Sequence, residues 1–330
     1  MLGMGSNPNP PMSAIPNSPT STIKLVFIHH SVGSDWLKPD SGNLRQALNQ
    51  NNYYVTESDY GWGPDSIGDL TDMGHWYNWF LGPQRDTYLQ ALYTNDFVSD
   101  TIGENTIPDP GGENRIILFK SCFISGDIIY GNPDDPPLPE GTVNPLYGKD
   151  QSEDTYYTVA NIKGLYRDLL KYFATRQDKL FILITTPPSI SQATTPADAA
   201  NLRAINTWLV RDWLANYPYK NVAVFDYYNI LTSNGGDANT NDLGAQTGSH
   251  HRYRNGQVEH LIGGSNFLAY PSGPDDSHPT AAGHQKATGE FIPLLNIIVN
   301  CWQNKGDCPA LAGGVTTASP NPPSGAEAPF

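Results

Sequence analysis

A serine that follows a short apolar segment is the first candidate for chemistry in this sequence. Ser31 stands in the stretch FIHHSVG, directly after the apolar residues of 24–28 and two histidines. A serine hydroxyl attacks a carbonyl when a base takes its proton and a third group orients that base. The stretch DDSHPTAAGH, far along the chain, offers both in His278 and in Asp275, three residues earlier. These residues predict a triad in which Ser31 is the nucleophile, His278 the base and Asp275 the orienting carboxylate.

Alternating strands and helices are predicted to position these residues. Continuous apolar runs, typical of strands buried on both faces of a parallel sheet, occur at residues 24–28, 53–56, 115–119, 180–185 and 222–225. Apolar spacings of three and four predict helices at residues 156–174 and 198–215, and a last helix is expected at 280–299. This alternation predicts a doubly wound α/β fold with helices on both faces of a parallel sheet. In such a fold the site lies beyond the carboxyl ends of the strands, where Ser31 stands.

The chain resembles the SGNH (GDSL-type) hydrolases. The DDSHPTAAGH block, the serine after the first strand and the order of elements over residues 23–298 carry this resemblance. It implies a flavodoxin-like sheet and a hydrolase that cleaves carboxylic esters through an acyl-enzyme, without a cofactor. The sequence departs from the family before the serine, where His29-His30 replaces the usual Gly-Asp.

The resemblance also implies an oxyanion hole. The backbone N–H groups of Ser31 and of Gly61 or Gly63, which follow the second strand, are the expected donors. The family normally adds an asparagine side chain after the third strand, but the stretch KSCFISGD contains no asparagine. Ser125 is the expected substitute, with Lys120 or a backbone N–H as alternatives. One missing donor typically costs about 10²–10³ in rate.

Aromatic and basic residues suggest how a substrate is held. The residues expected to contact it are His30, Trp62, Arg252 and Arg254. An insertion at residues 57–114 is rich in Trp, Tyr and Gly, and its aromatic side chains form either a sugar-stacking platform or a packing face. The two arginines either bind a hydroxyl-rich or carboxylate ligand or pair with surface acids.

These features favour a serine esterase that removes short acyl groups, such as acetyl, from carbohydrate. A non-catalytic carbohydrate-binding module on the same fold, a lipase or polyester hydrolase, and an acyltransferase remain alternatives.

Composition limits the range of partners. The net charge of −14, from 19 basic and 33 acidic residues, argues against a nucleic-acid partner. No apolar run approaches the roughly 20 residues that a membrane-spanning helix needs. Residues 1–21 and 311–330 are rich in Pro, Ser, Asn or Gly and are expected to be flexible, which leaves one domain at 22–310. The histidines of the stretch GSHHRYRNGQVEH show no recognised ligand spacing, so no metal is expected.

The three cysteines predict one disulfide. Cys301 and Cys308 flank the short polar stretch WQNKGD, and a bridge between them would close a small loop after the last helix. Cys122 is left over, next to a predicted strand. We expect the disulfide and a secreted or extracellular protein, because the spacer-like ends and the acidity also suit secretion; the alternative is three reduced thiols.

Overall fold

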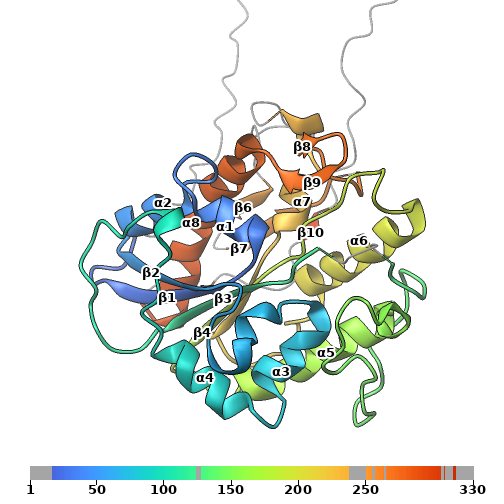
Figure 1. Ribbon diagram of the computed structural model, residues 1–330, viewed down its shortest axis with the longest axis horizontal. Helices are drawn as coiled ribbons and strands as arrows, with labels where there is room; N and C mark the ends of the chain where they lie inside the picture. Colours follow the sequence, from blue (N-terminus) through green and yellow to red (C-terminus); the bar gives the residue numbers. More distant parts are fainter. Residues whose placement is uncertain are drawn as a thin grey trace, which may run out of the picture.

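The computed structural model in Figure 1 describes residues 17–123, 128–237, 250–254, 257–263, 265–305, 308 and 315–316. Ser125 and nearly all of the segment at 311–330 lie outside the described residues, as does the N-terminal segment up to residue 16. Of the expected flexible segment 1–21, residues 17–21 are described. The carbonyl of Pro19 accepts a hydrogen bond of 2.7 Å from the Asn52 side chain, so the chain already lies against the domain there.

Five parallel strands form the central sheet. Their order is β2-β1-β3-β4-β5, so the strand that precedes Ser31 has a neighbour on each side. The strands are β1 (Ile23–Ile28), β2 (Tyr53–Ser58), β3 (Ile116–Lys120), β4 (Leu180–Ile184) and β5 (Val222–Phe225). Each matches a predicted run to within two residues, and the expectation of an α/β fold with a parallel sheet is confirmed.

Helices cover both faces of this sheet. Leu25 and Phe27 of β1 pack in one core with α1 (Ser31–Leu37), α2 (Leu44–Gln50) and α8 (Ala281–Trp302). Val26 and Ile28 point to the opposite face, because successive strand residues alternate. The core on that face also contains residues of α3 (Trp76–Phe80), α4 (Arg85–Tyr93), α5 (Val159–Phe173) and α6 (Pro196–Arg211). In Figure 1, α3, α4 and α5 lie below the strands, and α8 lies with α1 and α2 above them.

Local sequence signals account for the longer helices. α6 begins after Thr195, whose hydroxyl accepts the N–H of Asp198, and Pro196 occupies its first position. α5 begins after Thr158, which caps it in the same way. Ile162, Leu165, Leu169 and Phe173, the predicted apolar face of α5, are all fully buried. The helices expected at 156–174, 198–215 and 280–299 are therefore present, with ends shifted by at most four residues.

The insertion at 57–114 packs its large aromatics inward. It contains α3, α4 and the 3₁₀ turns η1 (Pro64–Asp69), η2 (Met73–His75) and η3 (Asp100–Ile102). Trp76, Trp79 and Phe80 are 0% exposed, and the Trp76 ring meets the Phe119 ring edge-on at 5.2 Å. Of the two alternatives for these three side chains, the packing face is the correct one.

Small elements complete the fold on the side of the carboxyl strand ends. β8 (Pro271–Gly273) and β9 (Asp276–Pro279) form an antiparallel hairpin, which Figure 1 shows beside α7 (Tyr227–Leu231). A second hairpin, β6 (His251–Arg254) and β7 (Gln257–Leu261), is extended by β10 (Val315–Thr316). Two more 3₁₀ turns are η5 (Asp154–Tyr156) and η6 (Asn234–Gly236).

The predicted disulfide joins Cys301, in the last turn of α8, to Cys308. Cys122 is a free thiol and is half-buried rather than fully buried. None of the helices in the described part of the chain combines the length and apolar character needed to cross a membrane.

Candidate active site

Three side chains from opposite ends of the chain meet beyond the carboxyl end of β1. The Nε2 atom of His278 lies 2.9 Å from the Ser31 Oγ. The other ring nitrogen, Nδ1, lies 2.7 Å from Oδ1 of Asp276. A carboxylate at Nδ1 holds the proton there, so that Nε2 is free to accept the serine proton. The arrangement is the geometry of an activated nucleophile, and it joins Ser31 to His278 as the sequence predicts.

The carboxylate is Asp276, however, and the expectation of Asp275 is wrong. The prediction assumed a helical turn, in which residues three apart are neighbours. Instead, Asp276 and His278 lie two apart on strand β9, where alternate residues share a face. Ser277 between them points elsewhere, and its Oγ accepts the N–H of Ile190 at 3.2 Å.

The Asp276 carboxylate is held in its charged form. It accepts the backbone N–H of His278 at 2.9 Å and the hydroxyl of Ser272 at 2.7 Å. The hydrogen bond from that N–H, with those from Ser272 and the imidazole, lowers the Asp276 pKa to about 2. The carboxylate is therefore ionised at neutral pH, as an orienting group for His278 must be.

The turn after β1 places Ser31 at the start of α1. His30 has extended backbone angles and its carbonyl accepts the N–H groups of Gly33 and Ser34, which begins the helix. The two histidine rings are buried on either side of this turn. His29 contacts the buried Glu57 of β2, with 2.9 Å between Nε2 and Oε2.

His30 was expected to contact substrate, and the structure argues against this. Its Nε2 lies 2.8 Å from the carbonyl oxygen of Gly68, and its Nδ1 lies 2.9 Å from the hydroxyl of Thr71. Burial lowers the His30 pKa to about 4, an effect that outweighs the hydrogen bond to Gly68. Both ring nitrogens are thus occupied and the ring is neutral, so His30 supports the site from beneath.

Tyr60 is a site residue that the sequence reasoning missed. It follows β2 by two residues, its side chain is 60% exposed, and its ring stacks on the His30 ring with 3.8 Å between centroids. Desolvation raises the pKa of the Tyr60 phenol, while hydrogen bonds with the hydroxyl and backbone N–H of Ser31 act in the opposite direction. Tyr60 therefore lies beside the turn that carries Ser31. The position of Tyr60 after a strand, next to the predicted Gly61, was the available signal.

The structure supports none of Gly61, Gly63 and Ser125 directly as an oxyanion donor. The N–H of Gly61 already donates to Oδ1 of Asp69 at 2.7 Å, so Gly61 is not a free donor. Gly63 precedes η1 with a φ of 78°, which favours glycine, and its role as a donor stays a prediction. Ser125 lies outside the described residues.

The end of β3 brings a buried amine toward the same region. Lys120 is 0% exposed, and its Nζ donates to the carbonyl of Ser121 at 2.8 Å. Burial lowers the Lys120 pKa to about 8, partly opposed by Cys122 and Asp59. The ring of Phe123, three residues after Lys120, meets the His278 ring edge-on, with 5.4 Å between the ring centroids. The described residues after β3 thus supply a buried lysine and an aromatic ring that contacts His278.

The structure does not support a substrate contact for the other three predicted residues, Trp62, Arg252 and Arg254. Trp62 is half-buried, stacks on Trp79 at 6.1 Å, and donates its indole N–H to Asn95 at 3.2 Å. Arg252 and Arg254 belong to β6, and their side chains lie outside the described residues.

Beside these arginines lies a buried polar cluster. Glu290 of α8 contacts the rings of His250 and His251, with Oε to Nδ1 distances of 3.3 and 3.0 Å. Lys286, one turn earlier, donates to Glu290 at 2.8 Å. Desolvation acts to raise the Glu290 pKa, but the two histidines and Lys286 together lower it well below 4.5. Among the described residues, no group of three or more His, Cys, Asp or Glu side chains could hold a metal ion.

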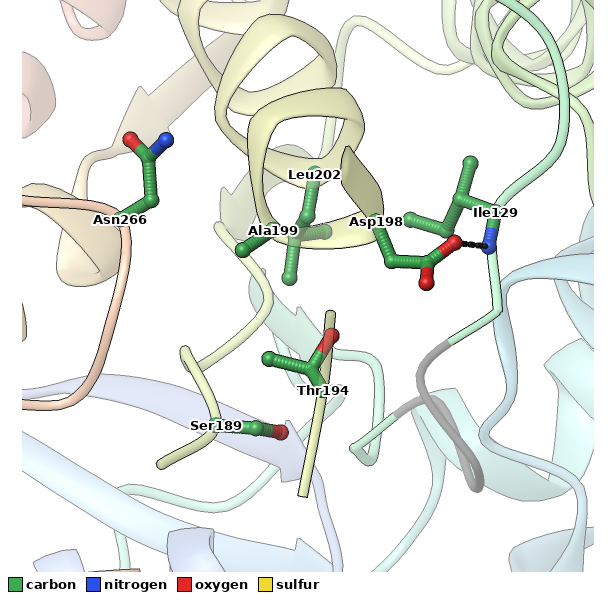
Figure 2. A pocket seen from close by; sticks show the side chains of 7 residues that line it. All are labelled: Ile129, Ser189, Thr194, Asp198, Ala199, Leu202 and Asn266. Atoms are coloured by element: carbon green, nitrogen blue, oxygen red, sulfur yellow. Dashed lines mark hydrogen bonds between the residues drawn. The ribbon is translucent and has the colours of Figure 1, made fainter. Parts of the chain in front are cut away.

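A small depression lies next to the hairpin that carries His278. Figure 2 shows it between the first turn of α6 and the segment with Ser189, with Ile129 and Asn266 at its sides. Asp198 accepts the N–H of Ile129 there at 3.0 Å. The cavity volume of this depression, about 10 Å³, has room for about one water molecule, and none of its lining residues belongs to the triad.

Comparisons with known proteins do not place the chain in a family. Searches of protein-family models, of curated proteins and of solved structures found no match. Its function is therefore inferred from its residues and their geometry.

Proposed function

We propose that this protein is a serine esterase that uses Ser31, His278 and Asp276. The observation that carries the proposal is the pair of contacts on one imidazole, 2.9 Å to the Ser31 hydroxyl and 2.7 Å to the Asp276 carboxylate. A serine that merely caps a helix would not need an imidazole with a carboxylate behind it. The strand order and the site at the carboxyl edge are compatible with a flavodoxin-like fold of the SGNH type, which we include in the proposal.

The reaction follows from the roles of the three groups. Ser31 Oγ attacks the ester carbonyl while His278 Nε2 takes the hydroxyl proton. Asp276 fixes the imidazole tautomer and stabilises the imidazolium that forms. His278 then gives the proton to the leaving alcohol, and an acyl group remains on Ser31. A water molecule, activated by the same imidazole, releases the acid and restores the serine.

The proposed substrate is a short acyl ester of a carbohydrate, with acetyl as the preferred group. The exposed Tyr60 ring, stacked on His30 directly before Ser31, offers one aromatic surface for a sugar. Trp76, Trp79 and Phe80 are buried and do not form a larger stacking platform, so the carbohydrate proposal rests on Tyr60. The Cys301–Cys308 disulfide favours an oxidising compartment, and we propose that the protein is secreted.

Covalent labelling tests the proposal directly. The protein is incubated with a fluorophosphonate, digested, and the modified peptide is sequenced by mass spectrometry. We expect one adduct, on Ser31, and none in Ser31→Ala. The matched control is Ser277→Ala, which removes a neighbouring serine whose Oγ accepts the N–H of Ile190 and leaves Ser31 unchanged. Absence of an adduct on the wild-type protein would overturn the esterase and support a non-catalytic binding module.

Hydrolysis and acyl transfer share the labelling result and differ in product. Turnover of p-nitrophenyl acetate is followed with and without an excess of xylose or glycerol as acceptor. For a hydrolase, the released acetate equals the released p-nitrophenol in both cases. Acetylated acceptor in place of acetate would move the assignment to an acyltransferase.

A further inference from the structure

The described residues assign few of the oxyanion donors that a serine esterase needs. Ser31 contributes its own N–H, but Gly61 donates to Asp69 at 2.7 Å instead of facing the nucleophile. The segment after β3 has no asparagine, and its described residues include Phe123 against the His278 ring. Two or three donors normally surround the negative oxygen that forms during acyl transfer. A side-chain hydroxyl from another described element can supply a further donor.

Tyr60 brings a hydroxyl to the right place. Its ring stacks on His30, the residue directly before Ser31, and the hydroxyl and backbone N–H of Ser31 act to lower the pKa of its phenol. In acyl transfer the carbonyl oxygen of the ester takes up a position close to these same two groups, because its carbon bonds to Oγ and its oxygen accepts the N–H. A phenol close to Ser31 lies at the border of the oxyanion position.

The ring of Tyr60 is supported from below. It stacks on His30 with 3.8 Å between centroids and 21° between planes. The His30 ring is itself fixed by Gly68 and Thr71, with contacts of 2.8 and 2.9 Å. At 60% exposure, the upper face of Tyr60 stays open to a substrate. This is the arrangement expected of a preorganised donor rather than of a loose surface side chain.

We propose that the Tyr60 hydroxyl is a catalytic oxyanion donor that replaces the missing asparagine side chain. The proposal rests on the proposed esterase function. When an ester binds, its carbonyl oxygen accepts the Ser31 N–H, and the phenol donates its own hydrogen to the same oxygen.

The proton balance of the step is simple. The bond from Ser31 Oγ to the carbonyl carbon forms, the π electrons move to the carbonyl oxygen, and the serine proton goes to His278 Nε2. Tyr60 keeps its proton throughout and contributes only a hydrogen bond. Desolvation, Cys122 and Asp59 raise its pKa, so the phenol is protonated at neutral pH and can donate.

The test is Tyr60→Phe, which keeps the ring stacked on His30 and removes only the hydroxyl. Tyr219→Phe is the matched control, because Tyr219 is also exposed, at 41%, and lies near the amino end of β5, away from the site. Steady-state kinetics with p-nitrophenyl acetate give kcat and KM for each variant. We expect kcat to fall about 10²-fold in Tyr60→Phe with KM changed by less than about threefold, and both to be unchanged in the control.

A transition-state analogue separates a donor from a support. An aryl trifluoromethyl ketone adds to Ser31 and forms an oxyanion, whereas the fluorophosphonate rate reports the nucleophile. For a donor, the inhibition constant of the ketone in Tyr60→Phe rises by the same factor as kcat/KM falls. An unchanged ketone affinity, or a variant that turns over faster than the wild type because the phenol blocks the site, would overturn the proposal. Wild-type protein that neither reacts with fluorophosphonate nor hydrolyses the ester would instead overturn the esterase, and the donor role with it.

Discussion

Replacing the two neighbouring aspartates one at a time tests the hairpin geometry of the site. Asp276 is the carboxylate at His278 Nδ1, whereas Asp275 is an exposed residue beside the turn of the same hairpin. Asp276→Asn keeps the size of the side chain, removes its charge and allows an amide N–H to face the ring. Asp275→Asn makes the same chemical change one residue away. The two variants therefore differ only in whether the altered group touches the imidazole.

The expected magnitude follows from the exposure of the pair. The carboxylate and imidazolium charges are roughly 4 Å apart, which corresponds to about 1 kcal/mol in water and about 4 kcal/mol near a protein surface. The side chains of His278 and Asp276 are 37% and 49% exposed, so the environment lies between these limits. Loss of that interaction in the transition state lowers kcat by roughly 5- to 1,000-fold. Enclosed triads lose about 10⁴-fold, and the open hairpin predicts a smaller effect.

The assay is kcat/KM for p-nitrophenyl acetate at neutral pH, with thermal unfolding to show that both variants are folded. We expect Asp275→Asn to stay within about twofold of the wild type. Combining Asp276→Asn with Ser31→Ala should cost no more than Ser31→Ala alone, since the residues act as a unit. If Asp275→Asn is the damaged variant and Asp276→Asn is nearly normal, the pairing in the hairpin is wrong.

Three further predictions concern substrate, core and disulfide. Specificity constants for aryl esters from acetate to decanoate should peak at acetate or propionate and collapse beyond butyrate, and a rise toward octanoate would favour a lipase or polyester hydrolase. Glu290→Gln should lower the free energy of unfolding in urea by about 3–5 kcal/mol at neutral pH, because it leaves the buried Lys286 charge without its carboxylate. The folded-state pKa of Glu290 is lowered, so its stabilisation is complete above about pH 4.5 and declines as pH falls below that value. The difference in free energy of unfolding between the wild type and Glu290→Gln should therefore narrow below about pH 4.5. A difference that stays constant with pH would contradict this prediction. Intact mass after alkylation, with and without reductant, should show Cys301 and Cys308 protected only in unreduced protein.

The sheet could be predicted because its strands are buried on both faces. A strand such as β4, with Leu180–Ile184 entirely buried, reads as an uninterrupted apolar run that no solvent-exposed residue breaks. The α6 start could be predicted for a local reason as well, since the cap at Thr195 and the proline after it act within one turn. Signals that act within a few residues are visible in a sequence without knowledge of the tertiary structure.

The identity of the carboxylate depended on a strand that was not recognised. The letters DDSHP contain no apolar alternation, so the short strand β9 leaves no hydrophobic signal. Read as a turn before a helix, the block favours Asp275, and read as a strand, it favours Asp276, because residues two apart share a face. The error therefore concerned backbone conformation and not the chemistry of the residues.

The oxyanion donors could not be predicted because other side chains compete for them. The sequence around Gly61 does not indicate that its N–H donates to Asp69, eight residues later. Such a contact depends on how the insertion folds back in η1. Tyr60 gains its position in the same way, through a ring contact with His30 from a different strand. Donor identity is thus a property of loop packing, which strand patterns do not encode.

The two histidines before Ser31 illustrate how the fold keeps one base for the nucleophile. Three histidine rings lie near the turn, and only His278 faces the serine hydroxyl. His29 is tied to Glu57, and His30 has both nitrogens occupied and a pKa of about 4. A neutral, fully bonded His30 does not take up the serine proton, and it adds no positive charge that would weaken the imidazolium of His278. The His30 ring also supports the Tyr60 ring, with 3.8 Å between centroids, so His30 and Tyr60 form one packed unit beside Ser31.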